Sequence, residues 1–294
     1  MEMTVRIEPD ADGYVGRECP TCKKYFKIKP GTGLPGAVPC HCPYCNHVGP
    51  PNEFFTEDQI DYAKSVMLNK LTGDFLSSLR RLERRPDPRA FISIGISVKG
   101  SPTPIIRYAE KELEERVTCA ACTLQYTIYG VFAHCPDCGV HNSLQIANAS
   151  FDVIIKTIDL AKSASADIAV KLIENALEDA VSCFDGFGRE QCSALTFRIS
   201  FQNIEGARDK LVKEIGLDIA SPYPAIWKFV CEQFQKRHLL AHKMGIIDSE
   251  FIARTGAPPA LLGRKVTFSE QDVRALINEL RLMADRLYQG VARP

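Results

Sequence analysis

The sequence has no excess of either charge, because its 36 lysines and arginines equal its 36 aspartates and glutamates. A neutral chain has no overall field that attracts nucleic acid, so such binding would need a local patch. The chain also lacks the roughly 18 consecutive apolar residues that a membrane-spanning helix requires. Its start, MEMTVRIEPDADGYVG, lacks the basic and apolar regions of a signal peptide. We therefore expect an intracellular, cytoplasmic protein with no membrane contact.

Cysteine is distributed very unevenly along the chain. Nine of the twelve cysteines precede residue 140, whereas Cys183, Cys192 and Cys231 are scattered singly through the second half. A reducing compartment keeps thiols unpaired, so the spacing calls for an explanation by metal binding or by burial. The asymmetry also predicts a boundary between a cysteine-rich first half and a different second half.

Four CxxC motifs form two matched pairs, CPTC followed by CPYC and CAAC followed by CPDC. Two residues between thiolates make a tight knuckle that presents both sulfurs to one ion, and two knuckles complete a tetrahedral cage for zinc. A redox dithiol would instead need one CxxC at the start of a helix that follows a strand. The pattern predicts two structural zinc ions per chain, held by Cys19, Cys22, Cys42 and Cys45 and by Cys119, Cys122, Cys135 and Cys138.

Three residues beside the CPYC motif leave the first ligand set open. Cys40, His41 and His47 each lie close enough in sequence to replace one of the predicted cysteines, although regular spacing favours Cys42 and Cys45. Four protein ligands leave no position for water or substrate, so both zinc ions are expected to stabilise the fold and take no part in catalysis.

A strand-like aromatic segment follows the first knuckle of each pair, as in the hairpins of a zinc ribbon. These segments are KKYFKIK and TLQYTIY. In the first, lysines alternate with Tyr25 and Phe26, a combination suited to phosphates and unstacked bases. Strand alternation could equally bury the aromatic rings and leave the lysines solvated. The ribbons are therefore candidates for positioning RNA or a regulatory protein, or serve only as scaffold.

The periodicity of the remaining sequence predicts an α+β chain with segregated parts. Residues 1–52 and 87–148 should each contain a zinc ribbon of short β hairpins, the second preceded by a strand that includes Ile92, Ile94, Ile96 and Val98. Residues 53–86 should form a linking amphipathic helix, and residues 149–294 an all-α bundle of four or five helices. The linking helix should start with a Thr56–Gln59 capping box. Its apolar stripe is Ile60, Ala63, Met67, Leu71, Phe75, Leu79 and Leu82.

The stretch QKRHLLAHKMGIID places a guanidinium and two imidazoles in a helix expected from about Ala225 to Met244. At about 100° per residue, Arg237 lies about 20° from Ile226, in the middle of the apolar stripe. His238 and His242 are one turn apart on an adjacent strip.

Three explanations compete for this cluster. In a structural one, Arg237 pairs with a buried carboxylate such as Glu178 or Asp179. In a metal-binding one, His238 and His242 join Cys231, but this set lacks a fourth ligand and an acidic general base. In the third, the cluster is catalytic.

The same residues resemble the ribonuclease motif of the HEPN superfamily, the higher eukaryote and prokaryote nucleotide-binding domains. Arg237 and His242 match its two defining residues, and His238 matches the polar position after the arginine. The tail KMGIIDSEFI is similar to the way many members leave this helix. The resemblance covers residues 149–294 and implies a HEPN-like helical domain that cleaves RNA without a metal, in a composite site at a homodimer interface.

Under this resemblance His242 is the general acid or base, Arg237 stabilises the phosphate oxygens, and His238 orients substrate or shares proton transfer. RNA supplies its own nucleophile, the 2′-hydroxyl, so no metal is required. The family also suggests a stress, toxin or antiviral-defence setting. The alternative is a zinc-ribbon module that binds nucleic acid or protein, with a catalytically silent helical domain that only dimerises.

Overall fold

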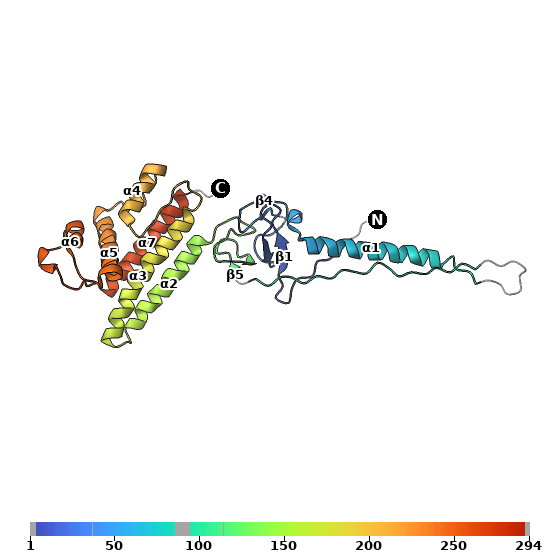
Figure 1. Cartoon of the computed structure of the whole chain (residues 1–294), viewed down its shortest axis with the longest axis horizontal. Coiled ribbons are helices and arrows are strands. Elements are labelled where there is room, and N and C mark those ends of the chain that lie inside the picture. Colours follow the sequence, from blue (N-terminus) through green and yellow to red (C-terminus); the bar gives the residue numbers. More distant parts are fainter. Residues whose placement is uncertain (1–3, 37, 86–94, 114, 292–294) are drawn as a thin grey trace, which may run out of the picture. The chain divides into compact units, whose positions relative to one another are not determined.

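The computed structural model describes residues 4–36, 38–85, 95–113 and 115–291 and divides the chain into two compact units. The first ends at His141 and the second begins at Asn142. The first contains the short strands and one long helix, and the second is helical (Figure 1). The chain is therefore mixed α+β, with its strands and its helical bundle in separate units. The first helix of the second unit, α2 (Ser143–Ala161), begins before the predicted start at residue 149.

A four-stranded antiparallel sheet joins the two predicted ribbons in the order β1-β2-β6-β5. Val15 pairs with Ile28 in the first hairpin, and Glu115 pairs with Ile128 in the second, so both hairpins have the same register 100 residues apart. The strands are β1 (Val15–Glu18), β2 (Tyr25–Ile28), β5 (Glu115–Thr118) and β6 (Gln125–Ile128).

The contact between β2 and β6 relates the two hairpins by an approximate two-fold axis. Lys27 lies opposite Thr127, the residue 100 positions later, so the axis passes between them. A two-stranded hairpin is only marginally stable by itself, and edge pairing removes one open edge from each. The two ribbons consequently form one structural body instead of two successive modules.

The second knuckle of each ribbon follows the same symmetry. The amide of His41 donates to the carbonyl of Pro136 (2.8 Å), and the amide of His134 donates to the carbonyl of Pro43 (2.9 Å). Each bond joins the residue before one knuckle to the proline inside the other. The first of these knuckles is framed by the short strands β3 (Cys40–His41) and β4 (Val48–Gly49), which pair with each other.

The core of the first unit is small and consists largely of aromatic rings and cysteines. Phe26, Tyr126 and Phe54 are fully buried, and Tyr25 is 7% exposed. Lys27 is also buried, with its ammonium 2.7 Å from Asp10. The aromatic rings of KKYFKIK are therefore buried in the core of the first unit and are not available to stack on bases. This agrees with the alternative in which strand alternation buries these rings.

Helix α1 (Glu57–Arg80) leaves this core and runs beside an extended return segment, residues 95–113 (Figure 1). Its N-terminus has the predicted capping box of Thr56 and Gln59. The side chain of Asn69 donates to the carbonyl of Thr103 (2.6 Å), and the guanidinium of Arg80 donates to the carbonyl of Gly100 (2.9 Å). A short 3-10 turn, Pro51–Phe54, precedes the helix.

The predicted strand near residue 94 is only partly within the described residues. Ile92 and Ile94 lie outside them. Ile96 forms an isolated bridge with Arg84, and residues 95–100 otherwise form no strand. Ile96 is 47% exposed, so the half-buried strand face expected there is not formed in residues 95–100.

The second unit packs its helices around α3 (Ala166–Gln191), which contacts α2, α5 (Pro224–Lys243) and α7 (Glu270–Gly290). A turn at residues 162–165 divides the continuous apolar pattern from residue 151 to residue 184. A short helix, α6 (Ser249–Thr255), follows α5, which carries Arg237. The helices after α2 are α3 (Ala166–Gln191), α4 (Ile204–Ile215), α5 (Pro224–Lys243), α6 (Ser249–Thr255), the 3-10 turn Pro259–Leu261, and α7 (Glu270–Gly290).

A buried carboxylate on α3 fixes the loop that leads to α4. Asp185, 4% exposed, accepts hydrogen bonds from the amide of Phe201 (2.6 Å) and the hydroxyl of Ser200 (3.1 Å). The ring of Phe201 then packs onto the backbone of α3 at Gly188, where a Cβ atom would lie 2.5 Å from the ring. Glycine is required at residue 188 because the ring occupies the space of a side chain.

Two glycines on α3 should respond to alanine with opposite signs. Gly188→Ala should lower the free energy of unfolding of the second unit by about 1–3 kcal/mol, since the new methyl group overpacks against a fully buried ring. Gly186→Ala, at an exposed position with nothing within 4 Å, should raise it by about 0.5–1 kcal/mol by restricting the unfolded chain. Urea unfolding followed by fluorescence of Trp227, the single tryptophan, measures both. Equal effects of the two changes would contradict this packing.

Candidate functional site

The eight predicted zinc ligands lie in two groups of four, and within each group the sulfur atoms are within 4.8 Å of one another. Four sulfurs at about 2.3 Å from a tetrahedral zinc ion are about 3.8 Å apart. The shortest separations agree with this geometry: Cys19 to Cys45 3.7 Å, Cys22 to Cys42 3.6 Å, Cys119 to Cys138 3.7 Å, and Cys122 to Cys135 3.4 Å. Both groups are thus compatible with a zinc ion.

All four CxxC motifs adopt the same backbone. In each, the residue after the second cysteine donates its amide to the carbonyl of the first cysteine, as Lys23 does to Cys19 (3.0 Å). That residue has a positive φ in every motif, although only Gly139 is a glycine. Residues with side chains adopt this left-handed conformation only where surrounding contacts hold them. The four residues are Lys23 (58°), Asn46 (54°), Thr123 (66°) and Gly139 (70°).

The pKa values of several of these thiols also indicate that the groups need a bound cation in order to ionise together. Burial raises the pKa of the Cys122 thiol to about 11 and raises the pKa of Cys42 and Cys135 further. Buried sulfurs packed this closely do not ionise together without a positive charge between them. Zinc supplies that charge, and sulfur is a ligand that it prefers.

The residues that might have replaced a cysteine lie outside the first group. Cys40 is buried, and its sulfur is 3.9 Å from the carbonyl of His41. A ring nitrogen of His41 is 3.1 Å from the side-chain oxygen of Asn46, and His47 lies 4.0 Å from Glu53. In the part of the chain that the structure describes, the metal-compatible groups contain only the eight predicted cysteines.

The second candidate site lies at the C-terminal end of α5. The helix starts at Pro224 and ends at Lys243, and Met244 after it has a φ of 53°. His238 and His242 are both exposed, and their rings are 4.8 Å apart between centroids. The two imidazoles therefore face solvent together, as the spacing predicts.

Arg237 is half-buried, and its guanidinium makes few hydrogen bonds. One terminal nitrogen of its guanidinium donates to the side-chain oxygen of Gln202 at a long 3.4 Å, and its Nε is buried without a hydrogen-bond partner. The amide nitrogen of Gln202 in turn lies 3.5 Å from Asp185. Sequence reasoning missed Gln202, because a neutral residue 35 positions earlier carries no sign of this contact.

Two of the three explanations for the α5 cluster lose support. Among the described residues Arg237 forms no ion pair, neither with Glu178 nor with Asp179, and Asp179 is exposed. The carboxylate partner that the structural explanation requires is therefore not found among the described residues. The metal-binding explanation also fails on the described residues, since Cys231 does not form a metal-compatible group with the two histidines.

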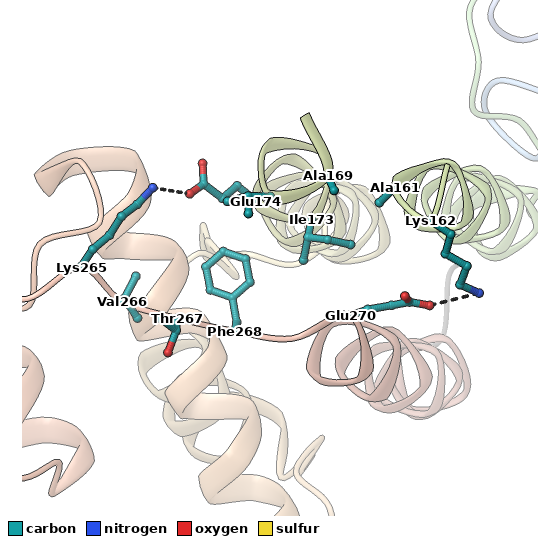
Figure 2. Close-up of a pocket in the computed structure, with 11 residues that line it drawn as sticks. Ala161, Lys162, Ala169, Ile173, Glu174, Lys265, Val266, Thr267, Phe268 and Glu270 are labelled. Carbon is teal, nitrogen blue, oxygen red and sulfur yellow. Dashed lines mark ion pairs between the residues drawn. The ribbon is translucent and has the colours of Figure 1, made fainter. Parts of the chain in front are cut away.

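The second unit also contains a cavity of about 390 Å³ (Figure 2). It is lined by the end of α2, the first turns of α3 and residues 265–270. Lys162 pairs with Glu270 (3.3 Å) at one side, and Lys265 pairs with Glu174 (2.8 Å) at the other. None of the three predicted catalytic residues lines this cavity.

Comparison of the chain with protein-family models, curated proteins and solved structures gave no match. Among the helices of the described residues, none has the length and apolar character needed to cross a membrane. The evidence for function therefore comes from the two cysteine groups and from Arg237, His238 and His242 on α5.

Proposed function

We propose that this chain is a metal-independent endoribonuclease of HEPN type, with one structural zinc ion in each ribbon. The observation that carries the catalytic part is the cluster on α5. Arg237, a guanidinium with no ion pair among the described residues, is on the same helix as two exposed imidazoles whose rings are 4.8 Å apart. A cation held without a carboxylate keeps its charge available to an anionic ligand, and phosphate is the ligand that a guanidinium fork fits best.

The residue types suit RNA cleavage by the 2′-hydroxyl. That oxygen attacks the adjacent phosphorus, and the bond from phosphorus to the 5′ oxygen breaks. One imidazole, assigned to His242, takes the proton from the 2′-hydroxyl or returns one to the leaving 5′ oxygen. Arg237 stabilises the extra negative charge on the phosphate oxygens. His238 orients the substrate or shares the proton transfer.

The openness of the cluster supports a homodimer. His238 and His242 are both exposed, as is Met244 at 87%, so no other part of the described chain covers the imidazoles. Electrostatic stabilisation of a transition state is strongest where water is excluded. A second copy that faces this end of α5 would cover the imidazoles and supply a second set of the same residues.

The products of cleavage test this proposal directly. Zinc-loaded protein should cut mixed RNA without added divalent ions and leave 2′,3′-cyclic phosphate and 5′-hydroxyl ends, because the nucleophile belongs to the RNA. End-specific ligation and mass spectrometry of the fragments identify both ends. Absence of turnover in dimeric protein with its full zinc content, or products with 5′-phosphate ends, would overturn the proposal.

The second candidate function is a binding module whose helical unit is catalytically silent. It is favoured by the two closed cysteine groups, which have no free ligand position, and by the symmetric sheet that holds them. Lys24 lies over the ring of Tyr44 (5.1 Å) and Lys29 over that of Tyr14 (5.5 Å), so the exposed ribbon surface offers cations rather than bare rings. RNA or protein binding without turnover would support this candidate.

A further inference from the structure

Helix α1 of the first unit presents an apolar stripe to solvent along most of its length. From Ile60 to Phe75 the stripe spans 15 residue steps, which is about 23 Å at 1.5 Å per residue, and Leu82 continues it in the turn after the helix. Its members are between 40% and 63% exposed, although they were expected to pack an amphipathic face. They are Ile60, Met67, Leu71, Phe75 and Leu82.

The return segment does not cover this stripe because it lies on the opposite face of α1. Its hydrogen bonds involve Asn69 and Thr72, which bond to Thr103, and Ser65, whose hydroxyl accepts from the amide of Ile106 (3.0 Å). Tyr108 of the same segment packs edge-on against Tyr62 (5.6 Å between ring centroids). At about 100° per residue, Asn69 lies about 180° from Ile60. The stripe therefore remains exposed although the return segment packs against α1.

The spacing of the stripe is symmetric about Leu71. Met67 and Phe75 are each four residues away from it, and Ile60 and Leu82 are each eleven residues away. When two copies of α1 lie antiparallel with a two-fold axis at Leu71, Met67 faces Phe75 of the second copy, and Ile60 comes level with Leu82 in the turn that follows the second copy's helix. Such self-complementarity is the requirement for an isologous contact between identical chains.

Lys64, the charged residue within the stripe, is compatible with this register. Its position corresponds to Ser78 in the antiparallel pair, where a small polar side chain leaves room for the lysine stem. Its ammonium is already turned toward Asp61 on the same helix (3.3 Å).

The charges at the two ends of α1 also select the antiparallel arrangement. The first turns are acidic, with Glu57, Asp58 and Asp61, and the C-terminal end is basic, with Arg80 and Arg81 and further arginines at residues 84 and 85. Antiparallel copies bring each acidic end near the basic end of the other, whereas parallel copies would place like charges together. The opposed helix dipoles add to the same preference.

We propose that α1 pairs antiparallel with α1 of a second copy of this chain, about a two-fold axis at Leu71. This contact is separate from the catalytic cluster, because the two lie in different units, and it holds whether or not the helical unit cleaves RNA. A chain that makes both the α1 contact and the proposed dimer contact at α5 can form assemblies larger than a dimer. Another protein or a membrane would have no reason to match a symmetric spacing.

Site-specific crosslinking in the full-length, zinc-loaded protein tests the register. A photo-reactive phenylalanine analogue is placed at residue 71 or residue 75, and equal amounts of 14N- and 15N-labelled chains are mixed before illumination. Residue 71 should crosslink between copies to the peptide that contains Leu71, and residue 75 to the peptide that contains Met67. The same analogue at Ser77, exposed on the same helix but turned about 120° away from the centre of the stripe, should give no crosslink between copies.

The variant Leu71→Glu places two carboxylates against each other on the axis. It should weaken association through α1 about a hundredfold or more, measured by analytical ultracentrifugation, because like charges meet in place of two leucines. Ser77→Glu, with the same added charge, should leave association unchanged. Unaltered zinc content and circular dichroism show that both variants are folded. Intermolecular crosslinks from residue 71 only to the helical unit, or none at all, would overturn the proposal.

Discussion

Replacing Cys42 by alanine should remove one of two zinc ions and abolish the cooperative fold of the first unit. A structural zinc ion contributes an apparent free energy of about 10–16 kcal/mol in small domains, which is as large as the total stability of a typical domain, about 5–15 kcal/mol. The first unit has a small aromatic core, and its two knuckle pairs are joined by reciprocal hydrogen bonds at Pro43 and Pro136. Loss of one ion should therefore also loosen the other ribbon.

The matched control is Cys40→Ala, two residues earlier in the same segment. Both thiols are buried, but only Cys42 belongs to a group of four. Metal analysis should find two zinc ions per chain in the original protein and in Cys40→Ala, and fewer than two in Cys42→Ala. Clearly fewer than two ions in undamaged original protein, or equal losses from both variants, would contradict the assignment of ligands.

The helical unit should survive the loss of zinc. It has its own apolar core, against which Trp227 packs, and the division of the chain at residue 141 separates this core from the cysteines. Urea unfolding followed by Trp227 fluorescence should therefore be unchanged in Cys42→Ala. Amide hydrogen exchange should lose its protection across β2 and β6 in the same variant.

Arg237→Ala and His242→Ala should each lower the rate of RNA cleavage by at least about a hundredfold while the protein stays folded. A positioned proton-transfer group contributes about 10²–10⁴ in rate, and a group that stabilises transition-state charge about 10²–10³. The structural cost should be small. Arg237 has one long hydrogen bond and no ion pair within the described residues, and His242 is exposed.

Three further variants make this result specific. Lys243→Ala, at the exposed charged position next to His242, should leave the rate unchanged and is the control for loss of surface charge. Arg237→Lys should restore only part of the rate, because lysine keeps the charge without the two-pronged geometry. His238→Ala should affect KM more than kcat if that residue orients substrate. Cleavage at the original rate by Arg237→Ala and His242→Ala would place the chemistry elsewhere.

Several features could be predicted because they depend on neighbours in the sequence. The CxxC spacing brings two sulfurs together within one turn of backbone, which is why all eight cysteines were found in the expected groups. The capping box of Thr56 and Gln59 is likewise a contact between residues three apart. The exposed pair of His238 and His242 follows from their spacing of one helical turn.

Contacts between distant residues could not be predicted in this way. Nothing in the sequence indicates that Lys27 lies opposite Thr127, since edge pairing depends on which strand edges remain open once both hairpins have formed. The contact of Arg237 could not be predicted either, because periodicity places this residue on the apolar stripe but does not identify Gln202 as its partner.

The sequence by itself determined the cysteine groups, the mixed α+β composition and the neighbouring imidazoles of His238 and His242, because each arises from residues within a few positions of one another. Only the tertiary structure decided that the two ribbons share one sheet, that Tyr25 and Phe26 are buried, and that the apolar stripe of α1 stays exposed. These outcomes depend on which surfaces are covered by segments far away in the chain. A hydrophobic pattern shows which face of an element is apolar, but it does not show what that face contacts.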